Sequence, residues 1–230
     1  MPGKPWVVLQ HVSYEGPGLI AAAAEHASHE LSVRHLHDGD AVPDPQDLDE
    51  LGALVVLGGP MGAHDEADYP YLAAERALLA VAVPAGLPVL GVCLGAQLMA
   101  ASCGAEVRVG AAGQEIGLGI VELTADGRAD PVFGPAGRVL PVLHWHGDTY
   151  ELPTDATHLA TSARYQQQAF RIGARAYGFQ FHVEVDGDAA TAMEPHLPDG
   201  IRLDRRHLAL VTRVGHGVLA RFAAAAGQQA

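Results

Sequence analysis

Apolar residues in the first half of the chain form short uninterrupted runs that alternate with stretches of helical spacing. The runs are strand candidates and lie at Trp6–Gln10, Ser32–Leu36, Ala53–Leu57 and Pro88–Val92. Between them, apolar residues recur every three or four positions in Leu19–Leu31, Tyr71–Val83 and Ala96–Ser102, which predicts helices. Continuous apolar strands separated by helices are typical of a parallel sheet that is covered on both faces. This half therefore predicts a doubly wound α/β fold.

The second half has a different pattern, in which short strand candidates are joined by turns. These candidates are Ile116–Leu123, Val139–His144, His158–Ala160, Gln168–Ile172 and Ala176–Phe181, and Leu203–Ala226 is predicted to be a closing helix. The pattern favours an antiparallel extension of the same sheet over a second domain. With no internal repeat and no low-complexity linker, we expect a single domain over residues 1–230.

Composition and charge exclude several classes of function. A formal net charge of −13 argues against nucleic acid as a partner, because phosphate binding needs a basic face. Apolar stretches are interrupted before the roughly 20 residues that a membrane span needs. The start, Met1-Pro2-Gly3-Lys4, has no apolar signal core. We therefore expect a cytoplasmic protein with no membrane partner.

Two cysteines are too few for a disulfide framework in a chain of 230 residues, so a chemical role for one of them is a better hypothesis. Cys93 lies in Gly91-Val92-Cys93-Leu94-Gly95, where a strand runs directly into a helix. The two glycines permit so tight a turn, which lifts the sulfur to a helix N-terminus. There the helix dipole is expected to lower the thiol pKa. Alone, the motif also fits a buried structural cysteine, as we expect for Cys103.

A candidate base for Cys93 lies about ninety residues later, in Gln180-Phe181-His182-Val183-Glu184. Residues two apart in a strand point to the same side, so Glu184 can hold one nitrogen of His182 while the other faces the thiol. This is the arrangement of a nucleophile–base–acid triad. The His-x-Glu pattern alone is weak evidence for a triad, because a chain with 13 histidines can contain it by chance. Together with the cysteine turn, it becomes a specific indication of one.

The two segments resemble the signature motifs of class I, triad-type glutamine amidotransferases. These include the glutaminase modules of GMP synthetase, anthranilate synthase and carbamoyl-phosphate synthetase. The resemblance extends from about Val7 to Glu184 and implies a flavodoxin-like α/β fold. It also implies a cysteinyl thioester mechanism that releases ammonia from glutamine, with no cofactor.

The resemblance also implies binding roles for further residues. Gly58-Gly59-Pro60 matches the family's oxyanion loop, whose amides would act with that of Leu94. Gln97 matches a residue that holds glutamine, and His146-Gly147-Asp148 matches a segment that lines the glutamine pocket. The chain departs from the family pattern at Val183, where proline is usual. We expect no fused synthetase domain, and the expected partner is a separate synthetase subunit.

Three functions remain open at this point. The first is a free-standing amidotransferase, and the second is a γ-glutamyl peptidase or hydrolase that uses the same thioester chemistry on γ-glutamyl conjugates. The third is a non-catalytic regulatory protein on the same fold, which the complete triad disfavours. Glutamine and peptide substrates would be distinguished by whether the leaving-group side of the pocket is closed or open.

Other motifs are interpreted as structural. His144 with His146, and His35 with His37, are His-x-His pairs, but neither has an evident third ligand, so we expect no metal. Residues 113–117 lie at the expected rim of the site and fit a plain turn equally well. The segment 61–68 fits a solvated acidic loop better than a lid or docking surface. No glycine cluster has the spacing of a dinucleotide or Walker motif.

Overall fold

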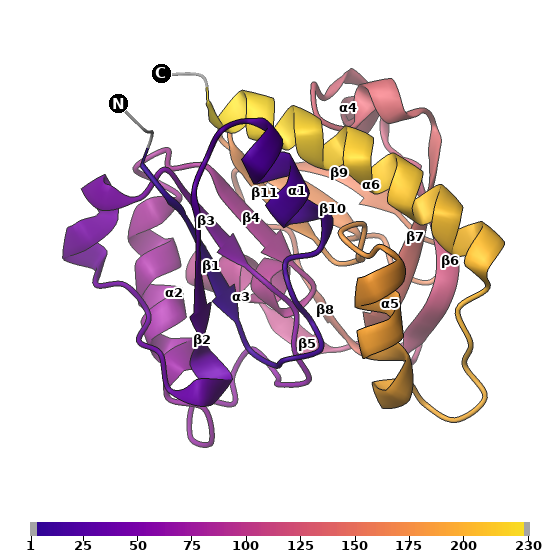
Figure 1. The fold of residues 1–230 in the computed structure, drawn as a ribbon, viewed down its shortest axis with the longest axis horizontal. Coiled ribbons are helices and arrows are strands. Elements are labelled where there is room, and N and C mark those ends of the chain that lie inside the picture. The colour runs from indigo at the N-terminus through magenta and orange to yellow at the C-terminus, as the bar shows by residue number, and fades with distance from the viewer. Residues whose placement is uncertain (1–3, 228–230) are drawn as a thin grey trace.

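A mixed β-sheet forms the centre of the molecule (Figure 1). The computed structural model describes residues 4–227, so the first three residues of the N-terminal segment considered above lie outside it. Within this range, nine strands form one sheet in the order β2-β1-β3-β4-β11-β10-β9-β6-β7. The parallel part consists of β1 (Trp6–Gln10), β2 (Leu31–His35), β3 (Ala53–Val56), β4 (Val89–Val92) and β11 (Ala176–Phe179).

The remaining strands of this sheet confirm the antiparallel extension. They are β10 (Ala169–Ile172), β9 (Ala156–Thr161), β6 (Glu115–Leu123) and β7 (Val139–His146), each antiparallel to its neighbour. A small second sheet, which the sequence did not predict, pairs β5 (Val107–Val109) with β8 (Asp148–Tyr150). It places β5 and β8 beside helix α3.

Helices cover both faces of the sheet, as predicted. On one face, α1 (Leu19–His26) packs beside α6 (Arg205–Ala226) over an apolar core, and Figure 1 shows α6 in yellow running along the sheet. On the other face lie α2 (Tyr71–Ala82) and α3 (Leu94–Ser102), over a second core. The short helices are α4 (Ala125–Ala129), α5 (Gly187–Met193) and 3₁₀ turns at Leu36–Asp38, Pro45–Glu50, Gly134–Ala136 and Glu194–His196.

Several element boundaries differ from the sequence prediction, among them those of the first helix and of β6. The first helix ends at His26, five residues before the predicted end, because Ser28 adopts a positive φ of 60° that a helix cannot continue through. The following strand then begins at Leu31, opposite Trp6. The strand predicted at Ile116 begins at Glu115, so the plain turn considered for residues 113–117 is wrong from Glu115 onward.

By length and composition alone, helix α6 is long and apolar enough to cross a membrane. Such a stretch was not expected from the sequence. Several of its apolar side chains, including Val218 and Phe222, are buried in the core that it shares with α1, whereas Leu210 is exposed. Burial of one side of a helix against a sheet accounts for this apolar content.

Candidate active site

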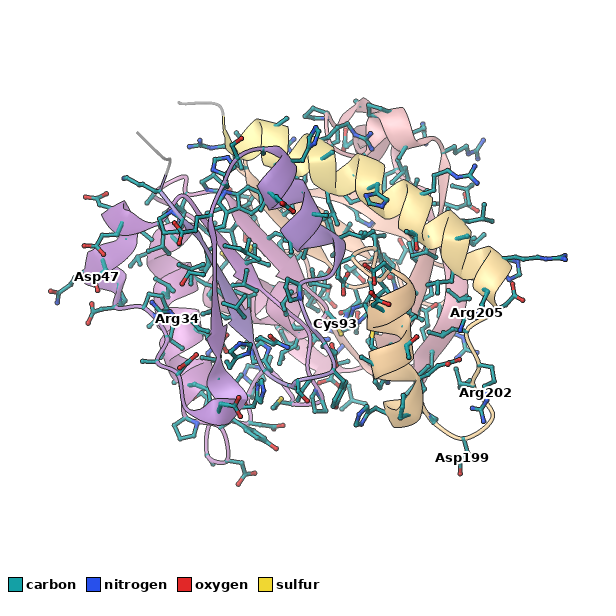
Figure 2. All side chains as sticks on the ribbon, in the orientation of Figure 1. Arg34, Asp47, Cys93, Asp199, Arg202 and Arg205 are labelled. Atoms are coloured by element: carbon teal, nitrogen blue, oxygen red, sulfur yellow. The ribbon has the colours of Figure 1, made fainter. Side chains whose placement is uncertain are left out.

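Cys93 occupies a strained turn between β4 and α3, as the sequence predicted. Its backbone has φ 51° and ψ −107°, a conformation that side-chain-bearing residues rarely adopt. A Cβ at Gly95 would overlap the carbonyl oxygen of Val56, and one at Gly91 would lie 2.5 Å from the carbonyl oxygen of Gly95. Both positions therefore require glycine. In Figure 2, Cys93 lies in the middle of the molecule, whereas the labelled Asp47 and Asp199 lie at its edges.

His182 and Glu184 form the hydrogen-bonded pair that the alternation predicts. Nδ1 of His182 lies 2.7 Å from Oε1 of Glu184, whose Oε2 accepts from the amide of Val183 at 3.0 Å. Among the described residues, Nε2 of His182 is buried and has no nitrogen or oxygen partner. Its ring interacts with the thiol of Cys93. Burial disfavours a charged imidazole, but Glu184 and Cys93 outweigh it and raise the pKa of His182 well above its ordinary value.

Three elements hold the segment that carries this pair. The backbone of His182 exchanges hydrogen bonds of 2.8 and 3.0 Å with Leu143 of β7. The amide of Leu19, at the start of α1, donates to the carbonyl of Glu184 at 2.8 Å. Helix α6 approaches so closely that a Cβ at Gly215 would overlap the carbonyl oxygen of Val183. The imidazole is therefore fixed from β7, α1 and α6 together.

The environment of the thiol corrects one expectation. The sequence predicted a lowered pKa for Cys93, but burial raises it, although His182 and the amide of Leu94 oppose this effect. The thiol donates to the carbonyl of Trp145 at 3.4 Å, and Nε2 of Gln180 lies 3.8 Å from the sulfur. The sulfur therefore lies close to its candidate base, in surroundings whose burial favours the thiol over the thiolate.

A cavity of about 480 Å³ opens at the sulfur. Most of the predicted site residues line it, namely Gly59, Cys93, Gln97, His146, Gly147 and Asp148. Met61, Gly62 and Asp65 line it as well, so part of the predicted acidic loop forms a wall of this cavity. His182 and Glu184 do not line the cavity and lie buried behind the sulfur.

The predicted oxyanion donors belong to Leu94, which follows Cys93, and to Gly59, which lines the same cavity as the sulfur. Leu94 is the first residue of α3, where helix geometry leaves the N–H free, and this amide interacts with the thiol. Among the described residues, the amide of Gly59 donates no hydrogen bond. Gly58 lies one residue back, with its carbonyl bound to His11. The amides of Gly59 and Leu94 are therefore available to an oxygen atom in the cavity.

Polar residues on the far wall are tied to one another. Nε2 of Gln97 donates to Oε1 of Gln180 at 3.2 Å and lies 3.5 Å from the carbonyl of Asp148. Both ring nitrogens of His146 are engaged, Nδ1 with the carbonyl of Asp148 at 2.9 Å and Nε2 with Glu115 at 3.1 Å. A substrate that hydrogen-bonds with this ring would have to replace one of these contacts.

The structure also places three titratable residues that the sequence interpretation missed. His11 is wholly buried, with Nδ1 2.9 Å from the carbonyl of Gly58 and Nε2 3.1 Å from both carboxylate oxygens of Glu75. The carboxylate of Glu15 is buried near His182, with a pKa raised by burial. None of them belongs to a motif: His11 directly follows an apolar strand, Glu15 lies in the turn after it, and Glu75 lies within a helix.

One expectation about metal ligands is wrong. The pair His144 and His146 does have a third neighbour of ligating type, because β6 pairs with β7 and brings Glu115 beside both rings.

Comparisons with known proteins agree with this fold. Residues 18–194 match the family model described as glutamine amidotransferase class-I. The amidotransferase-like protein YfeJ of Salmonella typhimurium is 35% identical over 189 residues, which cover 81% of this chain and 78% of that protein.

Solved structures show the same architecture. A glutamine amidotransferase from Thermotoga maritima has a TM-score of 0.85 at 30% identity, covering 98% of this chain and 100% of that one. One from Methylobacillus flagellatus has a TM-score of 0.85 at 25% identity, covering 99% and 97%. A GMP synthase component from Thermoplasma acidophilum shares the fold, with a TM-score of 0.67 at 23% identity over 97% and 94%.

The fold is a doubly wound α/β sheet with a cysteine at a strand–helix turn, which is the α/β class that the sequence predicted. The chain belongs to the class I glutamine amidotransferase family.

Proposed function

We propose that this protein hydrolyses the side-chain amide of glutamine through a thioester on Cys93 and supplies the ammonia to a separate synthetase subunit. One observation carries the proposal. The buried His182 is held by Glu184 at 2.7 Å, its Nε2 has no nitrogen or oxygen partner among the described residues, and its ring interacts with a thiol that opens into the cavity. Membership of the family supports the same chemistry. We also propose that residues 1–230 act as one domain.

In the first half of the reaction, Cys93 attacks the carboxamide carbon of glutamine and His182 takes the thiol proton. The new C–S bond turns the carbonyl oxygen into an oxyanion, which the amides of Gly59 and Leu94 stabilise. The raised pKa of His182 suits the imidazolium that forms, and Glu184 fixes its orientation. As the C–N bond breaks, the imidazolium gives its proton to the departing ammonia.

In the second half, water attacks the γ-glutamyl thioester. His182 takes a proton from the water, the same two amides stabilise the second oxyanion, and the C–S bond breaks to give glutamate and the free thiol. Gln97, Gly147 and Asp148 line the cavity at the position of the glutamine and are proposed to bind it. We propose the same for His146, in exchange for one of its present contacts.

Release of glutamate and ammonia from glutamine tests this proposal. We expect the Cys93→Ala and His182→Asn variants to lose at least about 10³-fold in turnover, as triad members do. Cys103→Ala is a matched control, because Cys103 is the other cysteine and lies outside the cavity. Unchanged turnover in Cys93→Ala would refute the mechanism, whereas absence of turnover in the wild-type protein would instead fit a non-catalytic or regulatory role for the fold.

A γ-glutamyl hydrolase is the second candidate, and the size of the cavity favours it. A volume of about 480 Å³ falls within the range of pockets that enclose ligands of drug size. A γ-glutamyl peptide would therefore fit with its leaving group beside Met61 and Asp65. Comparing kcat/KM for glutamine and for a panel of γ-glutamyl dipeptides separates the two functions, because an amidotransferase prefers glutamine.

A further inference from the structure

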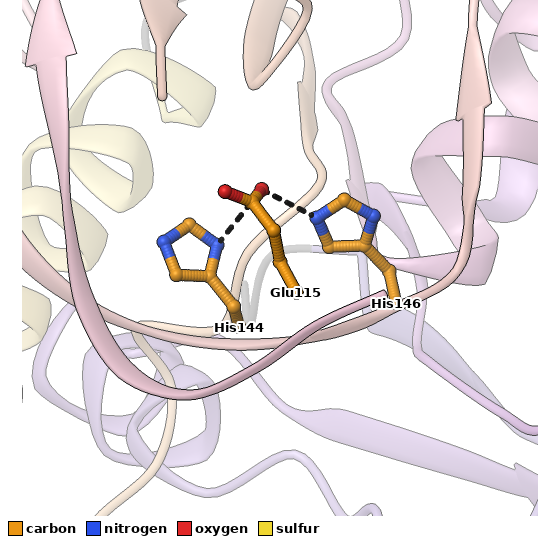
Figure 3. A group of neighbouring side chains, drawn as sticks. All are labelled: Glu115, His144 and His146. Atoms are coloured by element: carbon orange, nitrogen blue, oxygen red, sulfur yellow. Dashed lines mark hydrogen bonds and ion pairs between the residues drawn. The ribbon is translucent and has the colours of Figure 1, made fainter. Parts of the chain in front are cut away.

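A compact group of metal-ligating side chains lies at the end of the antiparallel extension (Figure 3). It consists of Glu115 on β6 with His144 and His146 on β7, and all three are largely buried. Glu115 is paired directly with His146, and His144 lies two residues along the same strand, so the three side chains share one face. One ligand atom from each lies within 4.8 Å of the others.

The hydrogen bonds of the two rings decide where their lone pairs point. Nδ1 of His146 lies 2.9 Å from the carbonyl of Asp148 and must donate to it, so in the neutral ring Nε2 carries a lone pair. That lone pair faces Oε2 of Glu115 at 3.1 Å, although a carboxylate oxygen is itself an acceptor.

His144 adds a third lone pair. Its Nδ1 is buried, has no hydrogen-bond partner among the described residues, and lies 3.8 Å from the same oxygen of Glu115. The ring also hydrogen-bonds with the backbone of Ile120, and because Nδ1 has no partner this contact falls to Nε2. Three acceptors therefore converge. Protonating His146 would satisfy its contact with Glu115 and leave Nδ1 of His144 without a partner.

A cation satisfies all three groups at once. We propose that Glu115, His144 and His146 bind a zinc ion. Zinc takes imidazole nitrogen and carboxylate oxygen at about 2.0–2.2 Å, which places two ligands of a tetrahedral site roughly 3.4 Å apart. Oε2 of Glu115 lies 3.1 Å from Nε2 of His146 and 3.8 Å from Nδ1 of His144, on either side of that value. Three protein ligands leave one coordination position open.

The surroundings have the outer-shell contacts that metal ligands need. The ring nitrogen of each histidine that faces away from the site contacts the backbone, at Asp148 for His146 and at Ile120 for His144. These contacts fix the tautomer of each ring. The carboxylate of Glu115 is fixed by Ser162, whose hydroxyl donates to Oε1 at 2.8 Å. Nε2 of Gln168 donates to Oε2 at 2.8 Å and lies 3.5 Å from Nε2 of His146. The carboxylate and both rings are therefore already oriented for an ion.

Access to this site is separate from access to the thiol. Glu115 and His144 line an outer cavity of about 340 Å³, whereas His146 lines the cavity that contains Cys93. An ion can therefore enter without passing the sulfur. Trp145, between the two histidines, accepts a hydrogen bond from the thiol, so bound zinc would fix the backbone beside the nucleophile.

Zinc binding to the chelator-treated protein, measured by titration calorimetry, tests the proposal, which does not depend on glutaminase activity. We expect one zinc ion per chain, and His144→Asn and Glu115→Gln should weaken binding by more than about tenfold, since loss of an outer-shell contact alone costs that much. His35→Asn, in the other His-x-His pair, should leave it unchanged. Absence of binding, or equal binding by His144→Asn, would overturn the proposal.

X-ray absorption at the zinc edge of the loaded wild-type protein gives an answer that does not depend on any variant folding. We expect imidazole nitrogen and oxygen ligands with no sulfur. The Cys93→Ser variant should bind zinc as the wild type does. A sulfur ligand, or loss of binding in Cys93→Ser, would place the ion at the catalytic thiol instead and refute the Glu115 site.

Discussion

At the scale of single residues, the chemistry depends on how burial and neighbouring charge act on one sulfur atom. Cys93 is buried, and the loss of hydration raises its pKa, whereas His182 and the helix N-terminus favour the thiolate. The sequence shows the second effect in the strand–helix turn. It does not show the first, because burial of the sulfur depends on β7 and β11, which follow much later in the chain.

The pH dependence of alkylation should report this balance. In a Cys103→Ala background, the rate of Cys93 alkylation by iodoacetamide should rise with pH and reach its midpoint above the ordinary thiol value of about 8.5. His182→Asn removes an opposing contribution, so its midpoint should move further up. A wild-type midpoint below the ordinary value would show that the free enzyme already holds a thiolate.

The proposed catalytic residues could be identified from the sequence because each lies in a short motif. Cys93 is flanked by glycines that the turn requires, and the alternation that continues beyond the end of β11 brings His182 and Glu184 together. Gln180 fits the same alternation, which therefore indicates it. Glu115 could not be assigned to His144 and His146, because their proximity depends on the register between β6 and β7.

At the scale of elements, a buried ion pair supports the loop that carries Gly59. His11 follows β1, Glu75 lies on α2, and the imidazole donates to the carbonyl of Gly58. Burial opposes the charge on His11, but Glu75 and the carbonyl of Gly58 raise its pKa above the ordinary value. Fixing the carbonyl of Gly58 orients the peptide whose N–H belongs to Gly59.

Removing Glu75 should therefore lower the free energy of unfolding by an amount that depends on pH. Glu75→Ala leaves a buried charge without its partner, which typically costs about 3–5 kcal/mol in the free energy of unfolding. Because the folded-state pKa of His11 is raised, its stabilisation is complete below the unfolded value of about 6.5 and is lost as pH rises through the folded value. The deficit of the variant should shrink over the same range.

Urea unfolding of both proteins between pH 5.5 and 9 measures this deficit. Glu66→Ala is the control, because it removes the more exposed ion pair with Arg76, which is worth at most about 1 kcal/mol. A deficit for Glu75→Ala as small as that of the control, or one that grows with pH, would contradict a charged His11.

Element boundaries followed the sequence where apolar periodicity was strong and failed where the segments were short. The parallel strands and long helices were predicted within a few residues. The small sheet of β5 and β8 was missed because three-residue strands carry no periodicity, and α5, from Gly187 to Met193, was missed because seven residues are too few to show a helical period.

At the scale of the whole molecule, the C-terminal helix supports the catalytic pair. Helix α6 packs against the loop that follows β11, and Gly215 lies directly on the carbonyl of Val183, between His182 and Glu184. Helix α1 holds the same loop from the other side of the sequence, because the amide of Leu19 in its first turn donates to the carbonyl of Glu184. Helices from both halves of the chain therefore hold this loop.

Adding one methyl group at this contact should affect stability and activity together. Gly215→Ala should lower the free energy of unfolding by about 1–3 kcal/mol, the usual effect of overpacking, and should reduce glutamine turnover. Gly217→Ala, on a different face of the same helix, meets only the flexible side chain of Arg221 and should gain up to about 1 kcal/mol from helix propensity. Equal stability of the two variants would contradict the close packing.

The central claim, that Cys93 is the nucleophile of a glutamine site, is tested most directly by a glutamine-mimicking electrophile, with the label located by peptide mass spectrometry. Cys103 is the more exposed cysteine, so accessibility alone would favour labelling there. We predict label on Cys93, protection by glutamine, and loss of label in His182→Asn. Label on Cys103 with none on Cys93 would contradict the assignment.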